Sequence, residues 1–137
     1  MKISKNTFKT TFDVLYTGCA LTVLVAFFLP WQGDCSGFDF VRYSTELVYL
    51  QYLAVLAFVM VGLVFMFFRY RYAQVAAAFL GFLNLVHIYA FRFGGVPDGM
   101  RYGWWITVVA YIAATVVSIG SLVLAPKWIE KKPKKTE

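Results

Sequence analysis

Four long apolar stretches dominate the pattern of hydrophobic and polar positions along this chain. They cover residues 11–29, 47–68, 73–91 and 104–125. Each is close to the roughly 20 helical residues needed to cross a hydrocarbon core of about 30 Å. Each is also apolar on every face, whereas a membrane strand of about 10 residues would alternate apolar and polar side chains. The pattern predicts an all-α, integral membrane four-helix bundle within residues 1–126, followed by a tail at 127–137.

Turn-forming or polar segments separate these stretches. Pro30 follows the first, residues 69–72 separate the second from the third, GGVPDG occupies 94–99, and Pro126 follows the fourth. Because the connection at 69–72 is short, the second and third helices are expected to be antiparallel neighbours. The longer connection at 30–46 is expected to form a short strand or a cap over the end of the bundle.

Composition agrees with a membrane protein. Of the 137 residues, 61% are hydrophobic, 20% are aromatic and only 15% are charged. A soluble domain usually carries about 25% charged residues. This balance argues against a soluble globular protein, a disordered protein and a disulfide-rich scaffold.

The basic residues are unevenly distributed and predict the orientation. Two predicted outer connections, at 30–46 and 92–103, carry three of them: Arg42, Arg92 and Arg101. The termini and the 69–72 connection carry ten: Lys2, Lys5, Lys9, Arg69, Arg71, Lys127, Lys131, Lys132, Lys134 and Lys135. The positive-inside rule therefore places both termini in the cytoplasm. The basic tail is expected to touch anionic lipid and not nucleic acid.

Small residues at helical spacing predict where the helices pack, because small side chains allow close helix contact in lipid. The candidate packing residues of the first, third and fourth helices are Gly18, Thr22, Ala26, Ala77, Gly81, Ala110, Ala114 and Ser118. These three helices are expected to pack tightly, with the second helix more peripheral. The same stripes are also suitable for contacts between copies of the chain.

The scarce polar side chains of the helices are expected to lie at a similar depth, towards the outer leaflet. This predicted polar cluster consists of Gln51, Asn84, His87, Thr107 and Tyr111, with a rim of Glu46, Arg92, Asp98 and Arg101. One interpretation is an interhelical hydrogen-bond network that fixes the order of the helices. The other is a small site that opens outwards, with His87 as its titratable group.

Groups that carry chemistry are few. The sequence has one histidine and two cysteines, without a CxxC, an HExxH or a nucleotide-binding loop. We therefore expect no catalytic, metal or cofactor site. Cys19 is expected near the middle of the first helix, about 15 Å from its outer end, too far from Cys35 for a disulfide. Cys35 is then either free or paired with another chain.

Three short patches carry a resemblance: LPW after the first helix, SGFD in the outer connection, and YGW at the start of the fourth helix. In these patches the chain resembles small bacterial four-helix membrane proteins of unassigned function. The matching residues are Leu29, Pro30, Trp31, Ser36, Gly37, Phe38, Asp39, Tyr102, Gly103 and Trp104. The resemblance implies the four-helix fold and a bacterial cytoplasmic membrane, and it implies no activity.

These features favour a non-enzymatic function. The leading hypothesis is an accessory or scaffold subunit that packs with other membrane proteins or with its own copies. One alternative is a homo-oligomeric pore or channel, similar in outline to holins, which predicts a polar stripe along the full length of one helix. The fourth helix comes nearest, but its polar residues do not form one continuous face. Another is an immunity or inhibitor protein that binds a toxin within the membrane.

Overall fold

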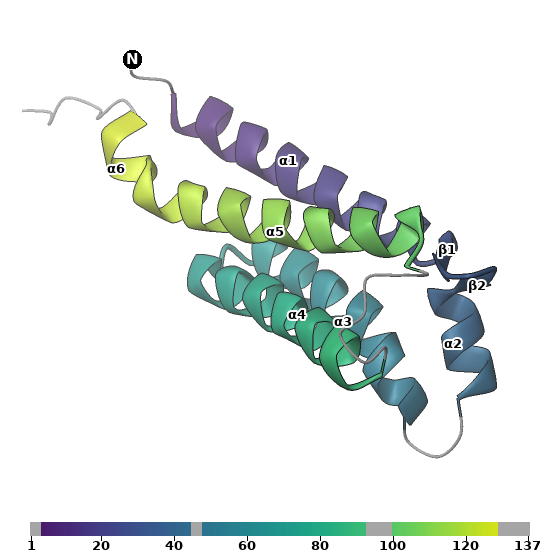
Figure 1. Cartoon of the computed structure of the whole chain (residues 1–137). Coiled ribbons are helices and arrows are strands. Elements are labelled where there is room, and N and C mark those ends of the chain that lie inside the picture. The colour runs from purple at the N-terminus through teal and green to yellow at the C-terminus, as the bar shows by residue number, and fades with distance from the viewer. Residues whose placement is uncertain (1–3, 45–47, 93–99, 129–137) are drawn as a thin grey trace, which may run out of the picture.

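Four long helices make up most of the computed structural model, which describes residues 4–44, 48–92 and 100–128 (Figure 1). The long helices are α1 (Lys5–Ala26), α3 (Val48–Phe67), α4 (Arg71–Phe91) and α5 (Tyr102–Val123). The short elements are β1 (Pro30–Gln32), β2 (Cys35–Ser36), α2 (Gly37–Tyr43) and α6 (Ala125–Trp128). All four long helices are long and apolar enough to cross a membrane. The predicted set of four apolar helices is therefore confirmed.

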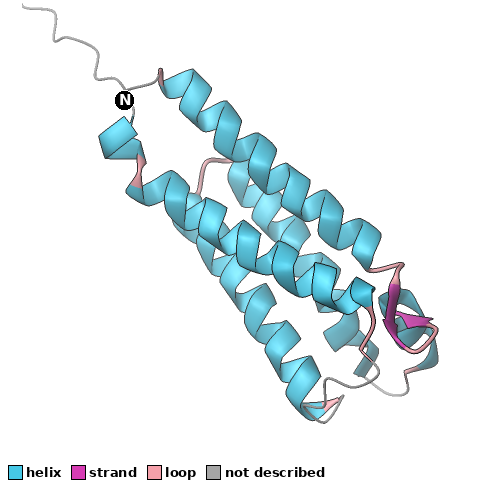
Figure 2. Cartoon of the chain, turned by 45° about the horizontal axis from the view of Figure 1, so that its top comes forward, coloured by secondary structure: helices cyan, strands magenta, loops and turns pink. Residues whose placement is uncertain are grey.

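The long helices form an elongated bundle. The most extensive contacts join α1 to α5 and α3 to α4, and α4–α5 and α1–α3 contacts close the bundle. Figures 1 and 2 show α6 and the start of α1 at one end, here called the terminal end, with the β-hairpin and α2 at the other, here called the hairpin end. The predicted pairing of the second and third apolar helices is confirmed by the α3–α4 contact.

The boundaries of α1 differ most from those predicted. The helix begins at Lys5 and not near Thr11, because the Ser4 hydroxyl accepts a hydrogen bond of 3.2 Å from the Thr7 N–H. It ends at Ala26 and not near Leu29, where the Ala26 carbonyl accepts a bond of 2.9 Å from the Trp31 indole. The other three helices begin and end within two residues of the predicted positions. Residues 129–137 of the predicted tail lie outside the described residues.

A small cap covers the hairpin end, as the sequence predicted for residues 30–46. Strands β1 and β2 pair antiparallel, with Gly33 at φ +57 in the turn between them. Helix α2 then begins with a reciprocal capping box, in which the Ser36 hydroxyl accepts from the Asp39 N–H and the Asp39 carboxylate accepts from the Ser36 N–H. Helix α2 packs against α3.

Large aromatic side chains seated on glycines fill the centre of the bundle. Tyr16 of α1 is fully buried and covers Gly62 of α3, while Tyr111 of α5 is fully buried and covers Gly81 of α4. A glycine lets a neighbouring ring approach its helix closely. The prediction that the second apolar helix is peripheral is therefore wrong, because α3 packs on α1, α2 and α4.

The predicted packing stripes are confirmed on two helices and only in part on the third. The predicted packing residues of α4 (Ala77 and Gly81) and of α5 (Ala110, Ala114 and Ser118) are buried, as expected. On α1, Ala26 is buried as well. Gly18 and Thr22 are exposed instead, so their assignment to packing within the chain is wrong. Helix α1 turns its Tyr16, Ala20 and Val23 face towards the core, because that face fits over Gly62.

Candidate functional site

Part of the predicted polar cluster forms between α3 and α4 at the hairpin end. The Asn84 amide donates a bond of 3.1 Å to the Gln51 carbonyl, and the Arg92 Nε donates one of 3.1 Å to Gln51 Oε1. The Gln51 amide nitrogen also contacts His87 Nδ1. Since an amide nitrogen only donates, His87 Nδ1 is the acceptor of this contact. These side chains join two helices, as the network interpretation expected.

The remaining members of the predicted cluster lie elsewhere. Thr107 is buried in α5 and donates a bond of 2.8 Å to the Gly103 carbonyl of its own helix. Tyr111 reaches across the core and donates to the Val55 carbonyl of α3. Both hydroxyls are thus satisfied away from Gln51 and His87, and the prediction of a single five-residue cluster is wrong. Residue spacing along α5 does not reveal how the helix is rotated about its axis, and that rotation decides which partners its side chains meet.

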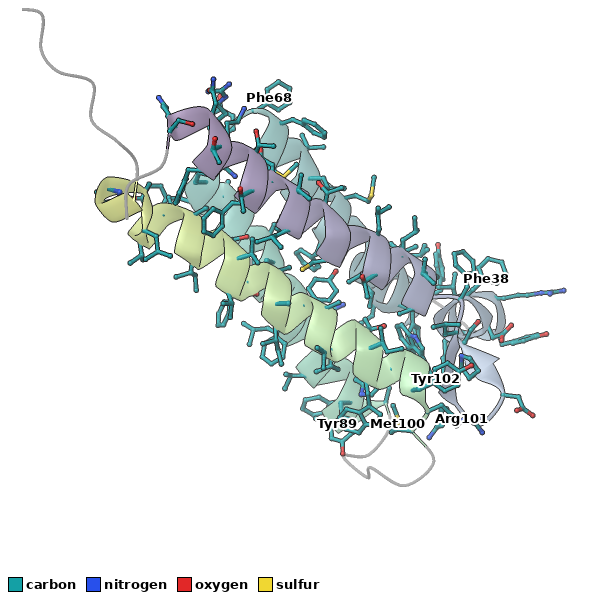
Figure 3. The ribbon with its side chains drawn as sticks, turned by 90° about the horizontal axis from the view of Figure 1, so that it is seen from above. Phe38, Phe68, Tyr89, Met100, Arg101 and Tyr102 are labelled. Atoms are coloured by element: carbon teal, nitrogen blue, oxygen red, sulfur yellow. The ribbon has the colours of Figure 1, made fainter. Side chains whose placement is uncertain are left out.

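The predicted rim is also divided. Arg92 joins the α3–α4 group. Arg101 lies at the start of α5, exposed, with its guanidinium 5.9 Å from the centre of the Tyr102 ring; both are labelled in Figure 3. Glu46 and Asp98 lie outside the described residues. In this part of the molecule His87 and Arg92 are exposed, and the His87 ring packs against Phe91 with centroids 4.5 Å apart.

A second polar chain, which sequence reasoning missed, runs through the other half of the bundle. Asp13 of α1 pairs with Arg71 of α4 at 2.9 Å, and Arg71 also donates a bond of 3.0 Å to Gln74. The buried Gln74 amide then donates a bond of 3.3 Å to Ser118 of α5. This chain links three helices. A signal was present in the sequence, because α1 and α4 both start at the terminal end and run in the same direction, and Asp13 and Arg71 both lie in the first half of their helices.

The exposed small residues of α1 line a groove. Gly18, Cys19 and Thr22 face Ala110 and Ala113 of α5 across a cavity of about 700 Å³, here called the α1–α5 groove. A Cβ added at Gly18 would meet nothing within 4 Å, whereas one added at Gly62 or Gly81 would meet a tyrosine ring. The space over Gly18 is therefore open, while the spaces over the two core glycines are filled.

Among residues 4–44, 48–92 and 100–128, no three His, Cys, Asp or Glu side chains gather closely enough to hold a metal ion. Within the same ranges Cys19 and Cys35 are both free thiols, and Cys35 is exposed on the hairpin.

The three sequence patches behind the resemblance meet in the cap at the hairpin end. A Cβ on Gly103 would lie 2.6 Å from the Pro30 carbonyl oxygen, and one on Gly37 would lie 2.7 Å from the Trp31 ring. The rings of Trp31 and Trp104 pack edge to face with centroids 5.2 Å apart. These residues lock the end of α1 to the start of α5, so their pattern has a structural explanation.

No protein-family model, curated protein sequence or solved structure matches this chain. The resemblance to small bacterial four-helix membrane proteins therefore stays a prediction.

Proposed function

We propose that the chain is a multi-pass protein of a bacterial cytoplasmic membrane, with four crossings and both termini in the cytoplasm. Four helices of sufficient length and apolarity support the crossings. Large apolar side chains exposed on these helices suit contact with lipid, among them Val25, Leu80 and Val116. Ten of the thirteen basic residues belong to the terminal end or the segments that flank it, which supports the orientation. The bacterial setting rests on the resemblance alone.

Within that membrane the proposed function is that of a non-enzymatic accessory subunit. It binds a transmembrane helix of another membrane protein, and association with a second copy is the alternative occupant that the experiment below separates. Lipid tails are as apolar as a helix surface, so helices associate in a bilayer mainly through close packing.

The α1–α5 groove is the observation that carries this proposal. Two core glycines are covered by tyrosines from neighbouring helices, so the close approach that these glycines allow is already used within the chain. Gly18 offers an uncovered backbone on the outside, in a groove whose α5 wall has Ala110 and Ala113 beside the larger Trp105, Ile106 and Val109. A ridge of large side chains on a partner helix fits such a groove.

Filling the groove tests the proposal. The wild-type chain, extracted in a mild detergent, is expected to form a species whose protein mass, with bound detergent subtracted, is well above 15.6 kDa. Gly18→Leu is expected to abolish the larger species, because the leucine occupies the groove. Val25→Leu is the matched control, since Val25 is an exposed α1 residue that does not line the groove, and it is expected to leave the larger species intact.

The composition of the complex then identifies the occupant. A photo-crosslinker attached at Cys19 in a Cys35→Ser background reports what lies in the groove, and the same reagent at Cys35 in a Cys19→Ser background is the control. A different membrane protein captured from Cys19 alone supports the accessory subunit, and capture of only a second copy replaces it with self-association. A wild-type chain that is monomeric, or a Gly18→Leu variant that assembles normally, contradicts the proposal.

A further inference from the structure

A basic pocket lies at the terminal end, apart from the α1–α5 groove and the α3–α4 polar group. Its volume is about 260 Å³. Four of its lining side chains are basic: Lys5 and Lys9 from α1, Arg69 from the α3–α4 turn, and Arg71 from α4. Pockets that hold drug-sized ligands usually measure about 300–1,000 Å³, so this pocket suits a small headgroup or ion.

Among the residues that the structure describes, only one of the four basic side chains of the pocket has an acidic partner. Arg71 pairs with Asp13 at 2.9 Å, and this is the one ion pair within residues 4–44, 48–92 and 100–128. Over the same residues, Lys5, Lys9 and Arg69 have no carboxylate within ion-pair distance. Like charges that share a pocket repel one another, and a bound anion removes that repulsion.

The backbone of Arg69 points to the same conclusion. Arg69 adopts φ +64, a left-handed conformation that strains most side chains and that glycine adopts freely. The turn alone would be better served by glycine. The left-handed residue closes the C-terminal end of α3, where the Arg69 N–H donates a bond of 3.1 Å to the Met66 carbonyl and the Tyr70 N–H donates one of 2.8 Å to the Phe65 carbonyl. Glycine is the usual residue at such a helix end, so the arginine here has a use besides the turn. Here the strained residue contributes one of the four cations to the pocket.

The start of α4 adds a further attraction for an anion. Its N-cap residue Tyr70 makes no side-chain capping bond, so the first N–H groups of this 21-residue helix lack a side-chain acceptor. The N-terminus of a long helix carries partial positive charge and free N–H donors. Arg71, a pocket residue, is the first residue of that helix.

We propose that this basic pocket binds the phosphate headgroup of an anionic phospholipid, on the assumption that the proposed membrane embedding is right. The pocket combines its basic side chains with the apolar Phe8 and Leu122. A lipid offers both features, a charged headgroup and an acyl chain. The terminal end of four crossing helices also lies at headgroup level, where basic pockets between helices hold anionic lipids.

The test is a lipid titration of the purified full-length chain in neutral detergent, followed by native mass spectrometry. Phosphatidylglycerol is the probe, phosphatidylcholine supplies the same phosphodiester without net charge, and inorganic phosphate represents the free anion. We expect one phosphatidylglycerol to bind more tightly than phosphatidylcholine. The K5Q/K9Q double variant is expected to bind it about thirtyfold more weakly, from roughly 1 kcal/mol for each basic residue near an anionic surface.

Two further variants separate the pocket from net charge and from misfolding. R42Q/R101Q removes two exposed charges at the hairpin end, and it is expected to bind phosphatidylglycerol as the wild type does. Arg69→Gly relieves the backbone strain and is expected to melt at the wild-type temperature or above while binding the lipid more weakly.

The following results would overturn the proposal. Equal weakening in K5Q/K9Q and R42Q/R101Q would overturn the pocket in favour of net charge, and unchanged binding in K5Q/K9Q or Arg69→Gly would also overturn it. Displacement of the lipid by inorganic phosphate at equal concentration would overturn the lipid in favour of the free anion. None of these results alters the mass of the groove complex, so the two proposals fail separately.

Discussion

The same glycine-to-alanine change is expected to have opposite effects at Gly62 and Gly18. A Cβ on Gly62 would lie 2.9 Å from Tyr16 Cζ and closer still to its hydroxyl oxygen, whereas one on Gly18 would meet nothing within 4 Å. Tyr16 is fully buried and cannot swing out of the way. Gly62→Ala is therefore expected to destabilise the fold, and Gly18→Ala to stabilise it.

The magnitude follows from two effects. Overpacking a filled core usually costs about 1–3 kcal/mol. Alanine gains about 1 kcal/mol over glycine in a helix interior, and this gain applies equally to both positions. It cancels in the comparison, so the free energy of unfolding of Gly62→Ala should lie about 2 kcal/mol below that of Gly18→Ala. Gly81→Ala, beneath Tyr111, should behave like Gly62→Ala.

The assay is reversible unfolding of the monomeric chain by a denaturing detergent, followed by far-ultraviolet circular dichroism. Tyr16→Phe supplies a second arm, because the buried Tyr16 hydroxyl has no hydrogen-bond partner among the described residues. Its removal is expected to raise stability by about 1 kcal/mol and to recover part of the Gly62→Ala loss. Equal stabilities of Gly62→Ala and Gly18→Ala would refute the assignment of Tyr16 to Gly62.

Two further predictions concern the ends of the bundle. Asp13→Asn and Arg71→Gln should each lower the free energy of unfolding by about 2 kcal/mol, because each leaves the other member of the ion pair as an unpaired charge. The two side chains are only 17% and 23% exposed, so water does not fully replace the lost partner. The double variant should lose less than the sum of the two, and strict additivity in the same unfolding assay would contradict the ion pair. Gly103→Ala should cost about 1–3 kcal/mol, because its Cβ would meet the Pro30 backbone. A Gly103→Ala variant with wild-type stability would contradict that close approach.

Hydropathy alone was enough to predict the four helices. A run of about 20 apolar residues has few alternatives, and three of the four helices begin and end within two residues of their predicted bounds. The start of α1 was missed because Lys5 and Lys9 place charge in the first two turns of a capped helix, and hydropathy does not register a cap.

Which face of each helix turns inwards could not be predicted as well. Small-residue stripes predicted the interfaces of α4 and α5, where Ala77 of α4 and Ala114 of α5 are buried. The same rule failed on α1, because Gly18 shares its helix with the larger Tyr16, and the core of this chain is built by rings over glycines of other helices. Such a fit depends on two helices at once, so periodicity within one helix does not reveal it.

The polar groups show the same limit. Depth along the helices correctly brought Gln51, Asn84 and His87 together, because α3 and α4 are joined by a short turn. Depth alone also grouped Tyr111 with them, although Tyr111 donates to the Val55 carbonyl. Depth along the axis does not fix rotation about it, and rotation decides which partners a side chain meets.

The most direct test of the central claim is cysteine labelling from one side of the membrane. A membrane-impermeant maleimide is applied to intact cells that express single-cysteine variants, one retaining Cys35 and the other carrying Thr136→Cys with both native cysteines replaced by serine. Four crossings with the terminal end inside predict labelling of Cys35 in intact cells and of position 136 only after permeabilisation. Labelling of position 136 in intact cells, or recovery of the chain from the soluble fraction, would contradict the claim.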